Sequence, residues 1–142
     1  GNGTQACFED DPTVMYLSTH ERGIYPYTGL AWERGAGNIH NLPLPRGSGS
    51  EAFRTAWYTK LLPELEDFRP QLLLISAGFD AHRADPLADM CLDTEDFAWI
   101  TRQLLQIAAR HAHGRVVSVL EGGYDIAALR ESCVEHVREL LG

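Results

Sequence analysis

The sequence lacks the features typical of disulfide-rich and membrane proteins. Its three cysteines form no C-x-x-C pair, which argues against both a disulfide framework and a thiolate metal site. No apolar run approaches the roughly 18 to 20 residues that a membrane helix needs, and the chain does not begin with a basic-then-apolar signal sequence. The sequence therefore predicts a cytoplasmic protein without membrane contact, in which each cysteine is a small core residue.

Several widespread catalytic signatures are also missing. There is no G-x-G-x-x-G, Walker A, G-x-S-x-G or H-E-x-x-H pattern, which removes the commonest nucleotide-binding, serine-hydrolase and zinc-protease interpretations. Basic residues are few, because 12 Lys and Arg stand against 20 Asp and Glu, for a net charge of −8. This balance argues against non-specific binding to nucleic acid and mildly favours cationic ligands.

What the sequence does contain is the pattern of one α/β domain. Its 142 residues, 44% of them hydrophobic, suffice for one core but not for two ordinary domains. The alternation of apolar runs and amphipathic patterns predicts a mostly parallel sheet with right-handed crossovers and flanking helices. The predicted strands are 14–17, 39–44, 72–76 and 116–120, and the predicted helices are about 50–68, 93–108 and 125 onwards.

Local signals refine two of these helices and two of these strands. Pro63 is expected to kink the first helix. Asp93 is expected to cap the second helix, with Asp96 at its third helical position. The last two predicted strands are apolar on both faces, which is typical of a parallel sheet covered by helices on either side.

The loop after the third predicted strand holds Asp80 and His82. In sheets of this kind, ligands bind beyond the carboxyl ends of the strands. A carboxylate at the rim of an apolar core needs a cation, a helix N-terminus or a metal as partner. Carboxylate and imidazole ligands suit Zn²⁺, but two ligands do not make a site. The alternatives are a loop aspartate that caps backbone N–H groups and an ordinary loop histidine.

The loop after the fourth predicted strand reads EGGYD at residues 121–125. Its two glycines allow a ligand to approach the backbone, and Tyr124 could donate a hydrogen bond to a developing oxyanion. The alternative is a turn followed by a half-buried tyrosine. Upstream, Tyr25 and Tyr27 lie in a Pro- and Gly-containing loop, where they could line a slot for an aliphatic chain or cover the core.

Five stretches of the sequence resemble a known family. They are GNGTQ at 1–5, GIYPYTG at 23–29, SAGFDAH at 76–82, DPL at 85–87 and LEGGYD at 120–125. In order and spacing they resemble the zinc-dependent histone deacetylase family. The residues within the motifs are most similar to its class II-like and acetylpolyamine amidohydrolase branch. The resemblance implies that residues 1–142 are the C-terminal portion of a single catalytic domain. The implied fold is arginase- or deacetylase-like, a three-layer arrangement with a mostly parallel sheet, present here as a partial domain.

The resemblance also implies roles for individual residues. Asp80 matches the second aspartate ligand of the catalytic zinc, whereas His82 matches no ligand. Tyr124 matches the tyrosine that, with the metal, polarises the acetyl carbonyl and stabilises the tetrahedral oxyanion. The residues that match the family's substrate tunnel are Tyr25 as an aromatic wall, Leu87 as an apolar rim, and Gly122 and Gly123 beside the tunnel.

Structural K⁺ or Na⁺ ions are a further implication of the resemblance. Ser18 corresponds to a contributor to one monovalent-cation site. A second site corresponds to residues that contribute mostly through backbone carbonyls, namely Phe8, Asp11, Val14 and His40.

Other parts of the family's active site have no counterpart in this sequence. In the family, a D-x-H segment with two more zinc ligands precedes the stretch that begins at Gly1, and the general-base histidines lie further upstream. Catalytic zinc normally has three protein ligands, so the chain alone is expected to be inactive. One hypothesis is therefore part of a zinc-dependent hydrolase that acts on acetyl-lysine or an acetylpolyamine. The other is a non-catalytic α/β module that binds a ligand or self-associates through an uncovered edge and apolar face.

Overall fold

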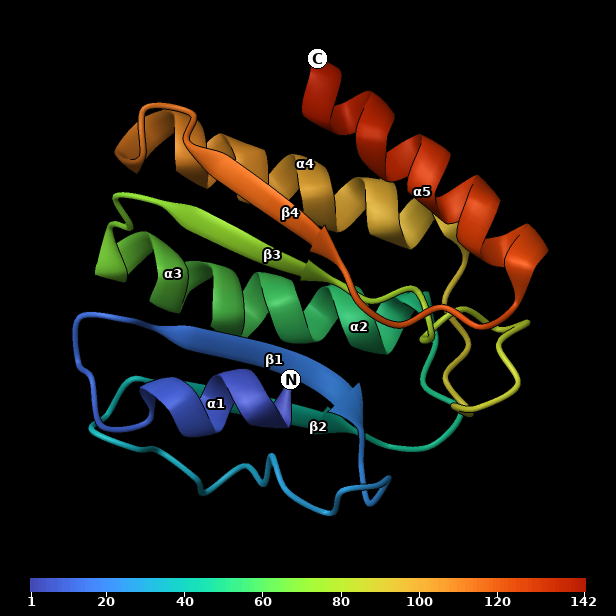
Figure 1. The fold of residues 1–142 in the computed structure, drawn as a ribbon, viewed down its shortest axis with the longest axis horizontal. Coiled ribbons are helices and arrows are strands. Elements are labelled where there is room, and N and C mark those ends of the chain that lie inside the picture. The colour runs from blue at the N-terminus through green and yellow to red at the C-terminus, as the bar shows by residue number, and fades with distance from the viewer.

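Four strands form two parallel pairs in the computed structural model, which describes residues 1–142 (Figure 1). β1 (Tyr16–Glu21) pairs with β2 (Ile39–Leu44), and the register sets Tyr16 opposite Ile39. β3 (Leu73–Ala77) pairs with β4 (Val116–Leu120), and Leu73 lies opposite Val116. The parallel pairing confirms the predicted α/β class.

Helices pack around these pairs and enclose the core with them. α4 (Thr94–His111) connects β3 to β4 and packs along α5 (Ile126–Leu141). The core lies between α4, the helical segment that precedes β3, and the strands, and it includes Leu61, Leu92 and Ile107. No helix is both long and apolar enough to cross a membrane. The cytoplasmic location stays a prediction.

The predicted helix over 50–68 forms, but its irregularity lies ahead of Pro63. It consists of α2 (Ser50–Ala56), the π-helical turn η1 (Trp57–Leu61) and α3 (Leu62–Phe68). Within it the N–H of Leu62 donates to Trp57 O, five residues back, as in a π-helix. Because Pro63 has no N–H to donate to the preceding turn, the regular ladder is interrupted at this point.

The start of α4 agrees with its predicted cap. The N–H of Asp93 donates to Asp96 Oδ2 at 2.9 Å. Asp96 is fully buried, which the sequence did not indicate, and it joins α4 to α2. Its carboxylate accepts hydrogen bonds from Ser50 Oγ at 2.6 Å and from Arg54 Nε at 2.7 Å.

The N-terminal region departs most from the sequence prediction. β1 begins later and runs further than predicted, because pairing starts where the N–H of Tyr16 donates to Asn38 O at 2.9 Å. α1 (Asn2–Phe8) was not predicted, since a buried polar residue rather than an apolar stripe anchors it. That residue is Gln5, whose side chain donates to Glu33 Oε2 at 2.5 Å and accepts from Asn41 Nδ2 at 2.9 Å.

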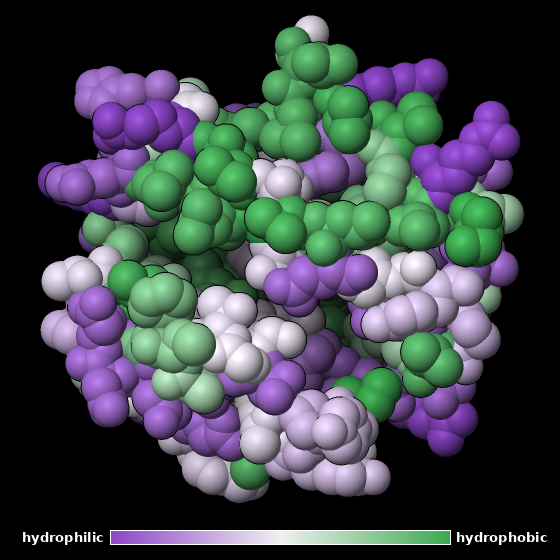
Figure 2. Space-filling view, viewed as in Figure 1, coloured by the Kyte–Doolittle hydropathy of each residue, from purple (hydrophilic) through white to green (hydrophobic).

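One face of the β3–β4 pair is open, so the expected cover on both faces is wrong for this chain. Leu73 and Ala77 are buried, whereas Leu74 and Val119 are 66% and 57% exposed. Figure 2 shows hydrophobic residues gathered in a band over β3, β4 and α5. Other exposed apolar residues in these elements or beside them are Leu72, Val117, Leu120 and Ile126. An exposed apolar face is what the sequence predicts for a partial domain.

Candidate active site at the ends of β3 and β4

The loops that follow β3 and β4 meet, as the sequence predicts. The N–H of Phe79 donates to Gly122 O at 2.8 Å, and the N–H of Glu121 donates to Ala77 O at 3.0 Å. The Asp80 carboxylate lies against the second loop, because a Cβ atom at Gly122 would be 2.5 Å from Asp80 Oδ2. Glycine at position 122 therefore allows the carboxylate and the backbone to approach each other this closely.

Asp80 is a half-buried carboxylate without a cationic partner. None of the ion pairs in the structure includes it. Burial raises the pKa of Asp80 most, its own backbone N–H opposes the rise, and the negative charges of Asp85 and Glu121 add to it. A bound cation would stabilise Asp80 in its charged form.

The residues of this chain fit a metal only in part. Asp80 can supply one carboxylate oxygen, which suits Zn²⁺. No group of three His, Cys, Asp or Glu side chains is arranged to share an ion. Because catalytic zinc normally takes three protein ligands, a zinc ion at Asp80 needs donors from outside these residues.

Asp85 is a positioning residue that sequence reasoning did not assign. It is 8% exposed, and its two oxygens accept N–H groups from Leu87 at 2.9 Å and from Tyr124 at 2.7 Å. The bond to Leu87 is an Asx-turn, which the D-P-L stretch could have indicated. The bond to Tyr124 joins residues 39 positions apart, so no local pattern predicts it. Asp85 thereby holds the two site residues in a fixed relation.

The side chains of Tyr124 and Leu87 are exposed at this edge of the sheet. Tyr124 is 54% exposed and Leu87 is 62% exposed. The turn before Tyr124 depends on Gly123, whose φ is +137°. A Cβ atom at Gly123 would lie 2.9 Å from Leu129 Cδ1, so the turn has neither the backbone freedom nor the space for a side chain.

Tyr25 lies in the loop that follows β1 and is 81% exposed. Its ring packs edge-on against Tyr27 at a centroid distance of 6.4 Å, so it does not cover the core. The end of β1 is joined to the loop after β3, because the N–H of Asp89 donates to Glu21 Oε2 at 2.6 Å. Tyr25 thus belongs to the same end of the strands, although the structure shows no contact between it and Tyr124.

His82 has the surroundings of an ordinary loop histidine. Its Nδ1 accepts the N–H of Ala84 at 3.1 Å. Its ring stacks on Phe97 at a centroid distance of 6.5 Å with an interplanar angle of 16°. These contacts favour the structural interpretation of His82 over that of a metal ligand.

Ser18, assigned by resemblance to a cation site, contacts a half-buried histidine. Ser18 Oγ lies 3.0 Å from His20 Nδ1, and His20 Nε2 lies 3.0 Å from Gly29 O. Because a carbonyl oxygen only accepts, Nε2 carries the proton and Nδ1 accepts from the Ser18 hydroxyl. Burial is the main cause that lowers the pKa of His20, although the bond to Gly29 opposes it. The cation role of Ser18 stays a prediction.

Three residues assigned to the second cation site come together, around a residue that sequence reasoning missed. The carbonyl oxygens of Phe8, Asp11 and Val14 lie 2.7, 3.0 and 2.8 Å from Asn38 Nδ2. Asn38 belongs to no motif and lies 24 or more positions from these carbonyls. No sequence signal pointed to it.

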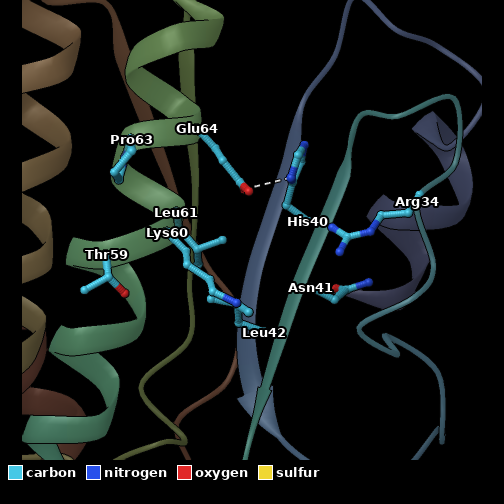
Figure 3. A pocket seen from close by; sticks show the side chains of 9 residues that line it. All are labelled: Arg34, His40, Asn41, Leu42, Thr59, Lys60, Leu61, Pro63 and Glu64. Atoms are coloured by element: carbon cyan, nitrogen blue, oxygen red, sulfur yellow. Dashed lines mark ion pairs between the residues drawn. The ribbon is translucent and has the colours of Figure 1, made fainter.

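His40 extends into a hollow that is separate from the loops after β3 and β4. Figure 3 shows the His40 side chain directed from β2 toward Glu64 of α3, with Nδ1 at 2.7 Å from Oε2. The hollow has a volume of about 280 Å³ and includes no residue of the loops after β3 or β4. It is lined by Arg34, His40, Asn41, Leu42, Thr59, Lys60, Leu61, Pro63 and Glu64. A cation role for the His40 backbone stays a prediction.

Comparison with known proteins extends over the whole chain. A family model described as "Histone deacetylase domain" matches residues 1–140. "Histone deacetylase 10, chloroplastic" from Oryza sativa subsp. japonica is 42% identical over 146 residues, which cover 100% of this chain and 33% of that protein. "Polyamine deacetylase HDAC10" from Danio rerio is 37% identical over 152 residues, covering 100% of this chain and 22% of that protein.

A solved structure agrees with these sequence matches. The structure of the histone deacetylase Clr3 is similar with a TM-score of 0.93 and 34% identity, over 100% of this chain and 25% of that chain. The chain spans about one third or less of the length of the curated relatives named above. The match of the family model to nearly every residue leads to one conclusion: the chain belongs to the histone deacetylase family.

Proposed function

We propose that the chain is the C-terminal part of a metal-dependent deacetylase domain that hydrolyses an N-acetyl amide. Asp80 carries this proposal, because it is a half-buried carboxylate of raised pKa with no cationic partner. It lies against Gly122, where the loops after β3 and β4 meet. We propose Asp80 as one ligand of Zn²⁺. Bound with further ligands, the ion would supply an activated water and a Lewis acid.

Tyr124 is the proposed donor to the acyl oxygen of the substrate. Its backbone is fixed by the Asp85 carboxylate, while its side chain is half exposed and its hydroxyl makes no hydrogen bond within the chain. A hydroxyl held at this edge can donate to an oxygen that gains negative charge as the amide is attacked. The backbone is held on both sides of Gly123, because Gly122 O accepts the N–H of Phe79 and Asp85 accepts the N–H of Tyr124. These bonds reduce the motion that would otherwise weaken a hydrogen bond from the Tyr124 hydroxyl to the substrate.

The proposed substrate is the acetylated end of an aliphatic amine. The exposed rings and methyl groups of Tyr25 and Leu87 lie at the same end of the strands and suit the sides of an aliphatic chain. The net charge of −8 suits a cationic amine. The relatives are named histone deacetylase and polyamine deacetylase, so we propose acetyl-lysine and acetylpolyamine as the two substrate classes.

The remaining metal ligands are proposed to precede Gly1 in the whole protein. A Cβ atom on Gly1 would lie 2.2 Å from the hydroxyl of Tyr16 in β1. Residues that lead into Gly1 would therefore pass close to β1, and we propose that they reach the loop after β3. This is the position in which a D-x-H segment could join Asp80 around one ion. We accordingly propose that residues 1–142 alone are inactive.

A second candidate function is a non-catalytic module that self-associates. The observation that favours it is the exposed apolar face of the β3–β4 pair, which includes Leu74 and Val119. Apolar faces of this kind commonly mark association surfaces. The two candidates differ in metal content, because a module of this type needs no ion at Asp80.

Metal content and hydrolysis by the whole protein test the proposal. We expect a bound zinc ion and release of acetate from an acetyl-lysine peptide or an acetylated polyamine. Asp80→Asn is expected to lower metal affinity by more than the roughly 10- to 100-fold seen when an outer partner of a ligand is removed. Asp89→Asn, an exposed carboxylate of the same loop, is the matched control and should retain the metal. Undiminished metal binding by Asp80→Asn would contradict the proposal, and a metal-free dimer would favour the second candidate.

A further inference from the structure

Three backbone carbonyls near the N-terminus converge on one point. They belong to Phe8, Asp11 and Val14, which follow one another at intervals of three residues. The N–H of Asp11 donates to Phe8 O at 3.0 Å, and the N–H of Val14 donates to Asp11 O at 3.1 Å. These consecutive turns direct all three oxygens inward. The point on which they converge is occupied by Asn38 Nδ2, at 2.7 to 3.0 Å from each oxygen.

Burial, a backbone hydrogen bond and close packing together fix the position of the Asn38 side chain. Asn38 is 5% exposed, and its backbone oxygen accepts the N–H of Tyr16 where β1 and β2 begin to pair. Gly35, with a φ of +53°, packs against the amide: a Cβ atom there would lie 2.8 Å from Asn38 Oδ1 and 2.3 Å from Glu9 O. The close packing leaves the amide nitrogen at the centre of the carbonyl ring.

A side-chain amide can substitute for a cation in such a ring. Rings of backbone carbonyls bind monovalent cations in channels, and the family resemblance assigns these same three carbonyls to K⁺ or Na⁺. The NH₂ group of Asn38 carries a partial positive charge and two protons, which it must share among three acceptors. A cation at the same point would collide with Asn38 Nδ2.

The opposite orientation of the amide would require an ion. If Oδ1 and Nδ2 exchanged places, four oxygens would face one another without a proton between them. The observed orientation avoids this repulsion, although it leaves Oδ1 buried without a hydrogen-bond partner. An unpaired buried oxygen is less unfavourable than four converging ones.

We infer that the side-chain amide of Asn38 takes the place of a monovalent cation, so that residues 8–14 are ordered without K⁺ or Na⁺. The inference uses no residue of the Asp80 site and is therefore independent of the proposed function. It makes this region of the chain an exception to what the family resemblance implies.

Amide hydrogen exchange in the whole protein tests the inference. The N–H groups of Asp11 and Val14 report on the turns, and exchange is compared in potassium chloride and in choline chloride of equal ionic strength. In the wild type we expect equal protection in both salts, within about twofold. A rise of about tenfold or more in potassium chloride would overturn the inference, because it would mean that Oδ1 faces an ion.

Substitution of Asn38 should create the dependence on a cation that the wild type lacks. In Asn38→Ala the three carbonyls lose their donor, so protection in choline chloride should fall roughly tenfold and potassium should restore it. Asn41→Ala is the matched control, because Asn41 is also buried and donates from its amide, to Gln5 Oε1. Its protection should be equal in the two salts.

Two results with these variants would overturn the inference. One is a potassium response in Asn41→Ala as large as that in Asn38→Ala, and the other is no response in either. If potassium also binds near Ser18, its effect on exchange is the same in all variants and cancels in the comparison. If Asn38→Ala does not fold, the comparison of salts in the wild type decides the question.

Discussion

The Asp80 site and the Asn38 ring both bring several oxygen atoms together, yet their polar groups are satisfied in opposite ways. In the ring, three carbonyls share a donor that the chain itself provides. At Asp80, burial and two neighbouring carboxylates raise the pKa, and no cationic side chain compensates the charge. A polar cluster completed within the chain supports the fold, whereas an uncompensated buried charge indicates a ligand.

The largest expected effect is on catalysis by Tyr124. Tyr124→Phe in the whole protein removes only the hydroxyl, so kcat should fall by about 10²- to 10³-fold while metal content is unchanged. Steady-state hydrolysis of an acetyl-lysine peptide measures the change. Tyr58→Phe, an equally conservative change at a 70% exposed position of η1, is the control. Equal activity of both variants would remove Tyr124 from the proposed mechanism.

A smaller effect, on stability, is expected at Asp85. Asp85→Ala leaves the N–H groups of Leu87 and Tyr124 without their charged acceptor, and it should cost about 3 kcal/mol of unfolding free energy. Urea denaturation measures the loss. Asp89→Ala, on the exposed part of the same loop, should change stability by no more than about 0.5 kcal/mol. A similar small loss for Asp85→Ala would show that the two N–H groups find other acceptors.

A still smaller effect is expected beside the Asn38 ring. Gly35→Ala forces a side chain into left-handed backbone and toward Glu9 O, so we expect a loss of about 2 kcal/mol. Gly37→Ala is a matched control because its φ is also positive but no atom lies within 4 Å of the added Cβ. Unfolding by urea measures both variants. If they lose equal stability, backbone strain alone accounts for Gly35 and the close packing contributes nothing.

The smallest expected effect concerns pH and another polar cluster completed within the chain, behind β3–β4. His136 lies 2.7 Å from Thr101 Oγ1 and 2.8 Å from Ser118 Oγ, and burial lowers its pKa from 6.5. The unfolded chain therefore takes up the proton first, so this contribution to stability is complete above about pH 6.5 and declines as the pH falls below it. The carbonyl and amide groups that form the Asn38 ring do not themselves titrate.

Urea denaturation at neutral pH and at pH 5.5 measures this decline in the wild type. His136→Gln should lose the part of the pH dependence that the buried imidazole causes. His113→Gln, at an exposed position, should retain it. Identical pH profiles for His136→Gln and the wild type would contradict the prediction.

The sequence was informative wherever apolar burial determines structure. β2 and β4 have the predicted bounds, because each is a short run bounded by Gly or Pro, which mark where a strand begins and ends. The meeting of the loops after β3 and β4 also followed from the general location of ligand sites in parallel sheets. The family and its partial coverage were predicted from five ordered motifs and are confirmed by the match to the family model.

What could not be predicted depends on single polar contacts between distant residues. Gln5 anchors α1 through hydrogen bonds with the side chains of Glu33 and Asn41, so no periodic apolar pattern predicts that helix. Asp85 reaches Tyr124 across 39 positions, and Asn38 reaches carbonyls 24 to 30 positions away. Such bonds depend on the relative placement of elements, which a local pattern does not contain.

The π-helical turn η1 is the one place in the segment before β3 where a one-residue deletion can be absorbed. A π turn contains one residue more than the α-helical turn that would replace it. Deletion of one residue there would restore a regular α-helix and leave Leu62 and Leu65 facing the core, whereas deletion elsewhere in 50–68 would rotate all later residues by about 100°. The first residue of the turn is held in place separately, because the Trp57 indole N–H donates to Thr19 Oγ1 at 3.1 Å. A one-residue length difference among relatives within 50–68 should therefore fall at η1.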